Sequence, residues 1–282
     1  MDYYPEPCAL DKIVNATIAA CDPLDGRADG VISRTDLCKL NFDLKSIIGE
    51  SYYCAAETSS SLGFGFSKRQ AGSAEGSETS STPAQNGTVS AKDVEVAQKI
   101  YDGLHNSKGE RAYLSWQIGC ELSDAPPSYD NATGTYVLNI PSIGGEYVTK
   151  VVQLRDIDNL QDLNGVTYDT LVDWMWIGMV RYLDSLQTTL PDLTPFQQAG
   201  GKLLHYHGES DPSVPAASSV HYWQAVREIM YPGMKSEESL QKMEGWYQFY
   251  LIPGAAHCGV NSLQPGPYPK DNMVSTASRR AD

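Results

Sequence analysis

The chain has 282 residues, 41% hydrophobic and 20% charged, which is ordinary for a globular protein with a sizeable buried core. Its formal net charge of −14 argues against a nucleic-acid partner, because a surface that binds nucleic acid must neutralise phosphates. No stretch approaches the roughly 18 consecutive apolar residues that a membrane-spanning helix needs, so we expect no membrane partner.

The cysteines and glycosylation motifs predict a protein that folds outside the cytosol. No two of the six cysteines form a CxxC motif, so a thiolate zinc site is not expected; they are Cys8, Cys21, Cys38, Cys54, Cys120 and Cys258. N-x-S/T sequons begin at Asn15, Asn86 and Asn131. Together these features favour a secreted, disulfide-bonded glycoprotein. Because DYYPEPC after Met1 lacks the basic and apolar regions of a signal peptide, we expect the natural N-terminus to lie upstream.

The first zone of the chain runs to about residue 57. Its segment LDKIVNATIAAC, residues 10–21, has apolar side chains at helical spacing and predicts an amphipathic helix. The helix leads into CDPLDGRADGVISRTDLC, which places Asp22, Asp25 and Asp29 within eight residues. Either this loop is a solvated acidic turn, or it holds a cation. The spacing is not that of an EF-hand.

The second zone, Thr58–Ser90, consists mostly of Ser, Gly, Thr and Ala. Such a composition buries too little apolar surface to order itself, so we expect a disordered insert. The dibasic pair Lys68-Arg69 lies within it. It is either two solvated charges on a flexible loop or a site for a kexin-type processing protease.

The third zone begins with AKDVEVAQKIYDGL, which predicts a helix closed by Gly103. Further along, YDTLVDWMWIGMVRYLDSL around Trp174 and Trp176 predicts a largely buried helix. The zone continues to the end of the chain, and its last ninety residues or so carry the chemical signal.

That signal is a strand, a helix and a second strand, with polar side chains after each strand. GKLLHYHGESDPSVP starts with the apolar residues Leu203 and Leu204, which fit a buried strand, and reaches Asp211. AASSVHYWQAVREIM predicts the helix, and GWYQFYLIPGAAHCG predicts a strand that breaks at Pro253-Gly254 and delivers His257. This is the α/β pattern, in which ligands bind at the carboxyl ends of the strands.

An Asp after one late strand and a His after the next follow the order of an α/β-hydrolase triad. In that reading His257 takes the proton of a serine, and Asp211 fixes the tautomer of the imidazole. Two plainer readings stay open. Asp211 is also a plausible turn residue, and His257 a satisfied, partly buried histidine that competes with four other histidines.

Three segments resemble the fungal tannase and feruloyl esterase family. HGESDPSVP and PGAAHCG are similar to its acid and histidine motifs, and CDPLDGRADGVIS is similar to its calcium loop. The resemblance covers about residues 5–57 and 91–270, and PGAAHCGVNSLQPGPYP and the dibasic insert favour the tannase branch. It implies a secreted serine esterase that cleaves phenolic esters, with Asp211 as acid and His257 as base. It also implies that Cys258 bridges to a cysteine directly before the nucleophilic serine.

The sequence departs from this family at the nucleophile. It contains no Gly-Cys-Ser-x-Gly-Gly turn, and Ser115, Ser123 and Ser142 lack the strand, turn and helix that such a serine needs. We therefore expect the C-terminal part of an esterase, with the nucleophile upstream of Met1. Its fold class would be α/β: a large calcium-binding lid domain over residues 1–195 and the C-terminal part of an α/β-hydrolase core over residues 196–282. Without the central strands, the strand residues 203–204 and 250–251 would lose neighbours.

The resemblance also favours a cation in the aspartate loop. It implies a structural calcium ion held by the carboxylates of Asp22, Asp25 and Asp29 and the backbone carbonyls of Arg27 and Val31. Gly26 and Gly30 permit the sharp turns, and Cys21 and Cys38, which bracket the loop, are expected to bridge; Cys8, Cys54 and Cys120 are left unassigned.

Two functions remain open. The chain is part of a phenolic ester hydrolase, acting on galloyl or feruloyl esters, or it is a non-catalytic, calcium-stabilised module that binds phenolics or glycans through its aromatic side chains. A Gly-Cys-Ser-x-Gly-Gly reading frame upstream in the genomic DNA would decide between them.

Overall fold

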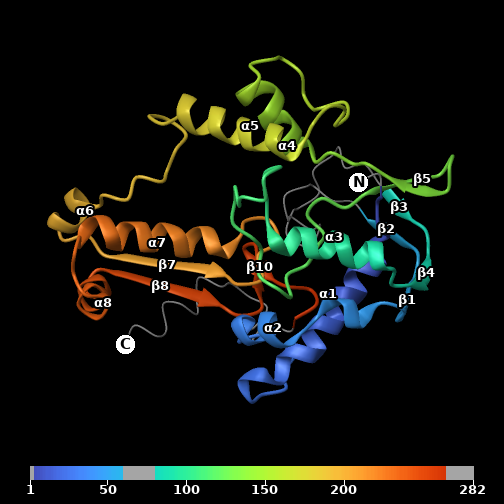
Figure 1. Cartoon of the computed structure of the whole chain (residues 1–282), viewed down its shortest axis with the longest axis horizontal. Helices are drawn as coiled ribbons and strands as arrows, with labels where there is room; N and C mark the ends of the chain where they lie inside the picture. Colours follow the sequence, from blue (N-terminus) through green and yellow to red (C-terminus); the bar gives the residue numbers. More distant parts are fainter. Residues whose placement is uncertain (1–2, 60–79, 265–282) are drawn as a thin grey trace.

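The computed structural model describes residues 3–59 and 80–264. The dibasic pair Lys68-Arg69 and the end of the chain lie outside the described residues. Among the described residues, no helix is long and apolar enough to cross a membrane. The elements fall into three groups along the chain, and Figure 1 shows the third group, with its strands β7 and β8, beside the first.

The first group is built on two packed helices, α1 (Pro7–Cys21) and α3 (Ala91–Asp102). As predicted, the apolar stripe of α1 is buried, including Ile13 and Val14 at 0% exposure. Ser90 and Asp93 form a capping box at the start of α3, and Gly103 ends it at a φ of 79°. Between these helices lie η1 (Asp22–Asp25), α2 (Thr35–Asn41), η2 (Leu44–Ile47) and β1 (Ser51–Cys54).

Two disulfides fasten this group. Cys21 and Cys38 are bridged, which confirms the prediction, and Cys8 is bridged to Cys54. A bridge that closes a loop of this length, 17 residues, stabilises a fold by about 3 kcal/mol. Cys120 is a free, buried thiol in the same core.

Part of the low-complexity zone is ordered, contrary to the prediction. β2 (Glu57–Ser59) pairs with β3 (Ser80–Thr82), and β4 (Gln85–Thr88) pairs antiparallel with β1. The prediction failed because composition says nothing about a partner strand. Gln85 is buried and its Oε1 accepts the backbone N–H of Cys8, while Val89 belongs to the core.

The second group holds the hairpin of β5 (Ser128–Asp130) and β6 (Thr135–Val137), α4 (Ser142–Glu146), the π-helix η3 (Tyr147–Val152), α5 (Tyr168–Arg181) and the short α6 (Thr194–Gln198). The prediction that α5 is largely buried was wrong, since Gly178 is its one buried residue. Trp176 is 60% exposed and Val180 70%. In Figure 1, α5 lies apart from the first and third groups, and it packs on η3, which continues α4. The predicted domain boundary after residue 195 falls inside α6.

The third group is a strand–helix–helix–strand unit: β7 (Leu203–Gly208), α7 (Ala216–Met230), α8 (Ser236–Glu244) and β8 (Tyr247–Ile252). The two strands pair in parallel, with His205 opposite Phe249 and His207 opposite Leu251. α7 packs on the face that carries these side chains, and Val226, Met243, Trp246 and Tyr247 form its core. The predicted strands and helix are confirmed.

The other face of this sheet is open. Leu204 is 51% exposed, Tyr206 36% and Tyr250 51%. Leu204 was predicted within a buried strand, and this was wrong because alternate side chains of a strand point to opposite faces. The turns after β7 and β8 continue into β9 (Ala255–Ala256) and β10 (Gly259–Val260), where the predicted site lies.

Candidate active site

Asp211 lies three residues beyond the end of β7, in a tight turn. Its backbone N–H donates to the carbonyl of Gly208, and its Oδ1 accepts the N–H groups of Ser213 at 2.8 Å and Val214 at 2.9 Å. These bonds fix the carboxylate with its Oδ2 turned toward the end of β8. The residue is 5% exposed, so its charge depends on these partners.

His257 comes to Asp211 on the turn that follows β8. Its Nδ1 lies 3.1 Å from Asp211 Oδ2, and its side chain is 21% exposed. Gly208 permits this approach, because a Cβ there would lie 2.5 Å from the carbonyl oxygen of Ala255. The structure thus brings together the two predicted catalytic residues, which are 46 positions apart in the sequence.

The surroundings of Asp211 favour its carboxylate form. Burial opposes ionisation, but hydrogen bonds from His207, the Val214 N–H, His257 and the Ser213 N–H outweigh it, so the pKa of Asp211 lies below its ordinary value. An ionised Asp on Nδ1 holds the imidazole with Nε2 as the proton-accepting nitrogen, which is the arrangement a general base needs.

A second histidine on Asp211 was missed by the sequence reasoning. His207 Nε2 lies 3.2 Å from the same Oδ2, and its side chain is 11% exposed. The period of two along β7 was the available signal, since it places His205 and His207 on one face of the strand.

The histidine turn is fastened to the first group of elements. The amide of Gln264 accepts the N–H of Ile32 through Oε1 and donates through Nε2 to Gly119 O and Ser210 Oγ. At the end of β7, Thr35 donates to Glu209 at 2.9 Å. The aspartate loop therefore ends, at Val31 and Ile32, directly against the turns that carry the predicted catalytic pair.

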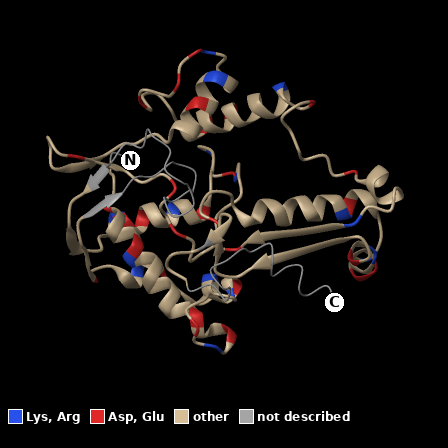
Figure 2. Ribbon diagram, turned by 180° about the vertical axis from the view of Figure 1, so that it is seen from behind, with Lys and Arg blue, Asp and Glu red and all other residues tan. Residues whose placement is uncertain are grey.

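The aspartate loop has the donors that calcium takes but not a converged site. Gly26 and Gly30 adopt φ angles of 88° and 81°, as its sharp turns require. One carboxylate oxygen each of Asp22, Asp25 and Asp29 accepts a backbone N–H of the loop itself. Figure 2 shows acidic residues gathered in the segment after α1. Within residues 3–59 and 80–264, no three His, Cys, Asp or Glu side chains lie close enough to hold a metal ion, so calcium binding stays a prediction.

The two free cysteines of the described residues differ in accessibility. Cys258 is exposed, next to His257, and adopts a φ of 52° that is unusual for a residue with a side chain. Cys120 is fully buried, and burial raises the pKa of its thiol. Of these two, Cys258 is the one that a cysteine of another segment can reach.

The three serines weighed as nucleophiles lie in unsuitable places. Ser142 opens α4 after Pro141, so no strand leads into it. Ser123 donates its hydroxyl to Glu121, and Ser115 lies in an irregular segment. None of the three has the strand–turn–helix frame of a nucleophile elbow.

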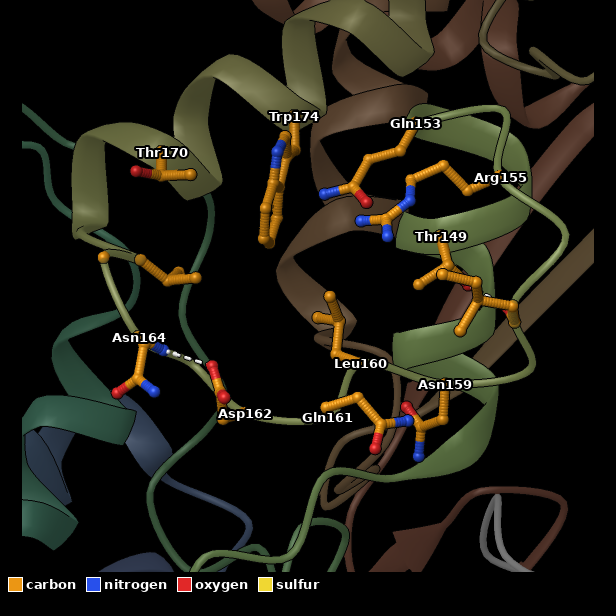
Figure 3. Close-up of a pocket in the computed structure, with 13 residues that line it drawn as sticks. Thr149, Gln153, Arg155, Asn159, Leu160, Gln161, Asp162, Asn164, Thr170 and Trp174 are labelled. Carbon is orange, nitrogen blue, oxygen red and sulfur yellow. Dashed lines mark hydrogen bonds between the residues drawn. The ribbon is translucent and has the colours of Figure 1, made fainter.

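A cavity of about 330 Å³ lies in the second group, between η3 and α5. Figure 3 shows the indole of Trp174 projecting into it, facing the amide of Gln153 and the guanidinium of Arg155. Gln153 Oε1 is buried and has no hydrogen-bond partner among the described residues. The wall combines apolar surface with polar side chains, and Asp162 and Asn164 lie on the side below Trp174.

These features can be compared with known proteins. The family model described as "Tannase and feruloyl esterase" matches residues 1–277. The chain belongs to the tannase and feruloyl esterase family. It is 75% identical over 280 residues to a tannase of Aspergillus oryzae, a match that covers 97% of this chain and 47% of that protein. It is 25% identical to a probable feruloyl esterase of Arthroderma benhamiae, over 96% of this chain and 42% of that protein.

Solved structures agree with this membership. A tannin acyl hydrolase from Aspergillus niger superposes with a TM-score of 0.84 at 48% identity, covering 99% of this chain and 46% of that one. Feruloyl esterase B from Aspergillus oryzae superposes with a TM-score of 0.62 at 21% identity, over 96% of this chain and 45% of that one, which shows the shared fold alone. The chain thus spans about half the length of the family members it matches.

Proposed function

We propose that this chain supplies the acid, Asp211, and the base, His257, of a serine-type carboxylic ester hydrolase that acts on phenolic esters. The 3.1 Å contact between His257 Nδ1 and Asp211 Oδ2, after two parallel strands, carries the proposal. It supports the interpretation of residues 196–282 as the C-terminal part of an α/β-hydrolase core; residues 1–195 are proposed as its lid.

Galloyl esters are the first candidates for the substrate. The chain is 75% identical to a protein named a tannase and 25% identical to one named a probable feruloyl esterase. A pocket shaped for one phenolic acid is more often kept between sequences that are three-quarters identical than between sequences that are a quarter identical.

The serine nucleophile and its oxyanion hole are proposed to come from a segment outside these 282 residues. The unsuitable surroundings of Ser115, Ser123 and Ser142 support this, as does the half-length coverage of the relatives. We further propose that Cys258, exposed beside His257, bridges to a cysteine of that segment and holds base and nucleophile together.

The test compares galloyl and feruloyl ester hydrolysis by the protein expressed from its full coding sequence. His257→Ala should abolish turnover, and Asp211→Asn should lower kcat by several orders of magnitude, because the imidazole would lose its orientation. The matched control is His221→Ala, an exposed histidine on α7. The 282 residues alone should be poorly soluble and hydrolyse these esters no faster than buffer. Activity from them alone, sensitive to serine-directed inhibitors, would refute the external nucleophile.

Calcium is proposed for the loop of Asp22, Asp25 and Asp29, with the carbonyls of Arg27 and Val31. The support is chemical: three carboxylates, those of Asp25 and Asp29 exposed and that of Asp22 half-buried, share one loop whose glycines already adopt positive φ. Binding requires these three carboxylates to converge on a common centre. Chelator should lower the Tm of the parent and leave that of Asp25→Ala unchanged. An equal shift in both proteins would place the ion elsewhere.

Secretion and glycosylation are also proposed. Asn15, Asn86 and Asn131 are all exposed, so a glycan on any of them is compatible with this fold. Cleavage after Lys68-Arg69 is proposed on the sequence alone. Intact mass before and after glycosidase treatment, with N-terminal sequencing of the secreted protein, tests these modifications.

The alternative function is a non-catalytic module that binds phenolics or glycans, and one observation favours it. The cavity beside Trp174 offers an aromatic face together with the buried amide oxygen of Gln153, which has no partner in the described part of the chain, a combination suited to a hydroxylated ring. Quenching of tryptophan fluorescence by gallate or glucose, lost in Trp174→Ala but kept in Trp176→Ala, would support binding. Retained binding together with no hydrolysis by the full-length protein would favour the module over the enzyme.

A further inference from the structure

Asp211 is held by four donors, and one of them is a second histidine side chain, His207, beside the proposed base His257. Its Oδ1 accepts two backbone N–H groups, and its Oδ2 lies 3.1 Å from His257 Nδ1 and 3.2 Å from His207 Nε2. The two histidines that contact this oxygen come from different elements: His207 lies on β7, and His257 lies on the turn after β8. His207 therefore contacts the group that orients the proposed base.

The partners of His207 fix where its proton lies. Its Nε2 is also 3.1 Å from the carbonyl oxygen of Val214, so both neighbours of Nε2 are acceptors and Nε2 must carry a proton. In the neutral ring Nδ1 is then an acceptor. The hydroxyl of Ser219, on α7, lies 2.7 Å from Nδ1 and donates to it.

The same reasoning continues away from Asp211. The Ser219 oxygen, having given its proton to His207, accepts from His205 Nε2 at 3.1 Å. His205 Nδ1 in turn accepts the hydroxyl proton of Tyr247, 2.8 Å away on β8. Each donor thus faces the next group on the way to Asp211. Hydrogen bonds aligned in one direction polarise each other, and this chain ends on a carboxylate.

The series of hydrogen bonds from Tyr247 to Asp211 is shielded from solvent, so water competes little for these groups. Tyr247 is 1% exposed, and the ring of Phe249 lies 4.7 Å from that of His205. Burial and the neighbouring His207 lower the pKa of His205, which keeps its ring neutral. The number of linked groups matters as well. Four side chains from β7, β8 and α7 must be correctly placed for the His207 N–H to point at Asp211: Tyr247, His205, Ser219 and His207 itself.

We infer that His207 is a positioning residue for ester hydrolysis: held by Ser219, His205 and Tyr247, it fixes Asp211 Oδ2 where His257 can donate to it and shares the charge of that carboxylate. This inference rests on the proposed hydrolase function. The ionisable side chains that lower the pKa of Asp211 are His207 and His257. The charge of Asp211 in turn contributes, after burial, to the raised pKa of the Cys120 thiol.

The kcat/KM of the full-length protein for ester hydrolysis tests the role of the His207 Nε2–H donor. His207→Leu removes the donor and should lower kcat/KM about ten- to a hundredfold, the effect of a misplaced catalytic group. The acidic limb of kcat/KM should move to higher pH, because a carboxylate with one donor fewer stabilises the protonated base more strongly. His207→Gln, which can still donate to Asp211, should restore most of the activity. His221→Ala is the control.

Nitrogen-15 NMR of the histidine rings tests the chain without using hydrolysis. His207 and His205 should both carry their proton on Nε2, and Ser219→Ala should change the ring signals of His207. A proton on Nδ1 of His207 would overturn the inference. So would a loss of kcat/KM in His207→Leu that is equal at every pH and that the His207→Gln variant shares. If the wild type hydrolyses no phenolic ester, the proposed function fails. The response of the His257 Nδ1 proton resonance to His207→Leu then decides whether His207 positions Asp211.

Discussion

Gly208→Ala is the change that probes the predicted catalytic pair most directly without touching it. A Cβ at position 208 would lie 2.5 Å from the carbonyl oxygen of Ala255 and 2.7 Å from that of Ala256. Both are backbone atoms, so no side-chain rotation relieves the contact. Ordinary contact begins at 3.4 Å, and the Ala255 carbonyl must therefore retreat by about 0.9 Å.

That retreat acts on the turn that carries His257. The bond from His257 Nδ1 to Asp211 Oδ2 is 3.1 Å, and a shift of this size along it would exceed the range of a hydrogen bond. We expect a loss of about 1–3 kcal/mol in the free energy of unfolding, the usual effect of overpacking. We also expect about a hundredfold loss in kcat/KM of the full-length enzyme, the effect of a misplacement near 1 Å.

Denaturant unfolding and ester hydrolysis measure the two losses separately. The matched control is Gly144→Ala in α4, where a Cβ meets nothing within 4 Å and φ is not positive. A Gly208→Ala protein with unchanged activity and stability would refute the reasoning, because it would mean that the end of β7 and the turn after β8 are not in close contact.

Three further predictions concern buried and exposed groups. Burial raises the pKa of Glu209, so its ionisation lowers the free energy of unfolding as the pH rises through that pKa. The Glu209→Gln side chain still accepts the hydrogen bond from Thr35 but cannot ionise. This variant should therefore have a higher Tm than the parent above about pH 7 and an unchanged Tm below about pH 4. In the 282-residue chain a thiol reagent should modify Cys258 at once and Cys120 after unfolding, whereas equal rates would contradict the burial of Cys120. Tyr250→Lys on the open sheet face should make that chain more soluble but destabilise the full-length protein, and a stabilised full-length protein would show that nothing covers this face.

The sequence was most informative where one local signal decides the structure. The apolar spacing of α1, the Ser90 cap and terminal Gly103 of α3, and the break of β8 at Pro253-Gly254 each act within a few residues. The order of Asp211 and His257 after two predicted strands was enough to place both at one edge of a sheet, because parallel strands end on the same side.

It was least informative where burial depends on what another segment covers. The apolar residues of α5 indicated a buried helix, yet Trp176 and Val180 are exposed, because hydrophobicity shows that a surface can be buried and not what buries it. Likewise, β4 is ordered by its pairing with β1 and not by its own composition.

By itself, then, the amino-acid sequence determined the helices and strands near the site, the Cys21–Cys38 bridge and the two residues of the predicted catalytic pair. The tertiary structure alone decided that Cys8 pairs with Cys54 and that Val31 ends the aspartate loop against the histidine turn. It also decided that His207 shares the carboxylate of Asp211. The physical reason is that such contacts depend on how separate elements pack, and a hydrogen bond or a disulfide is specified to a fraction of an ångström that no local pattern encodes.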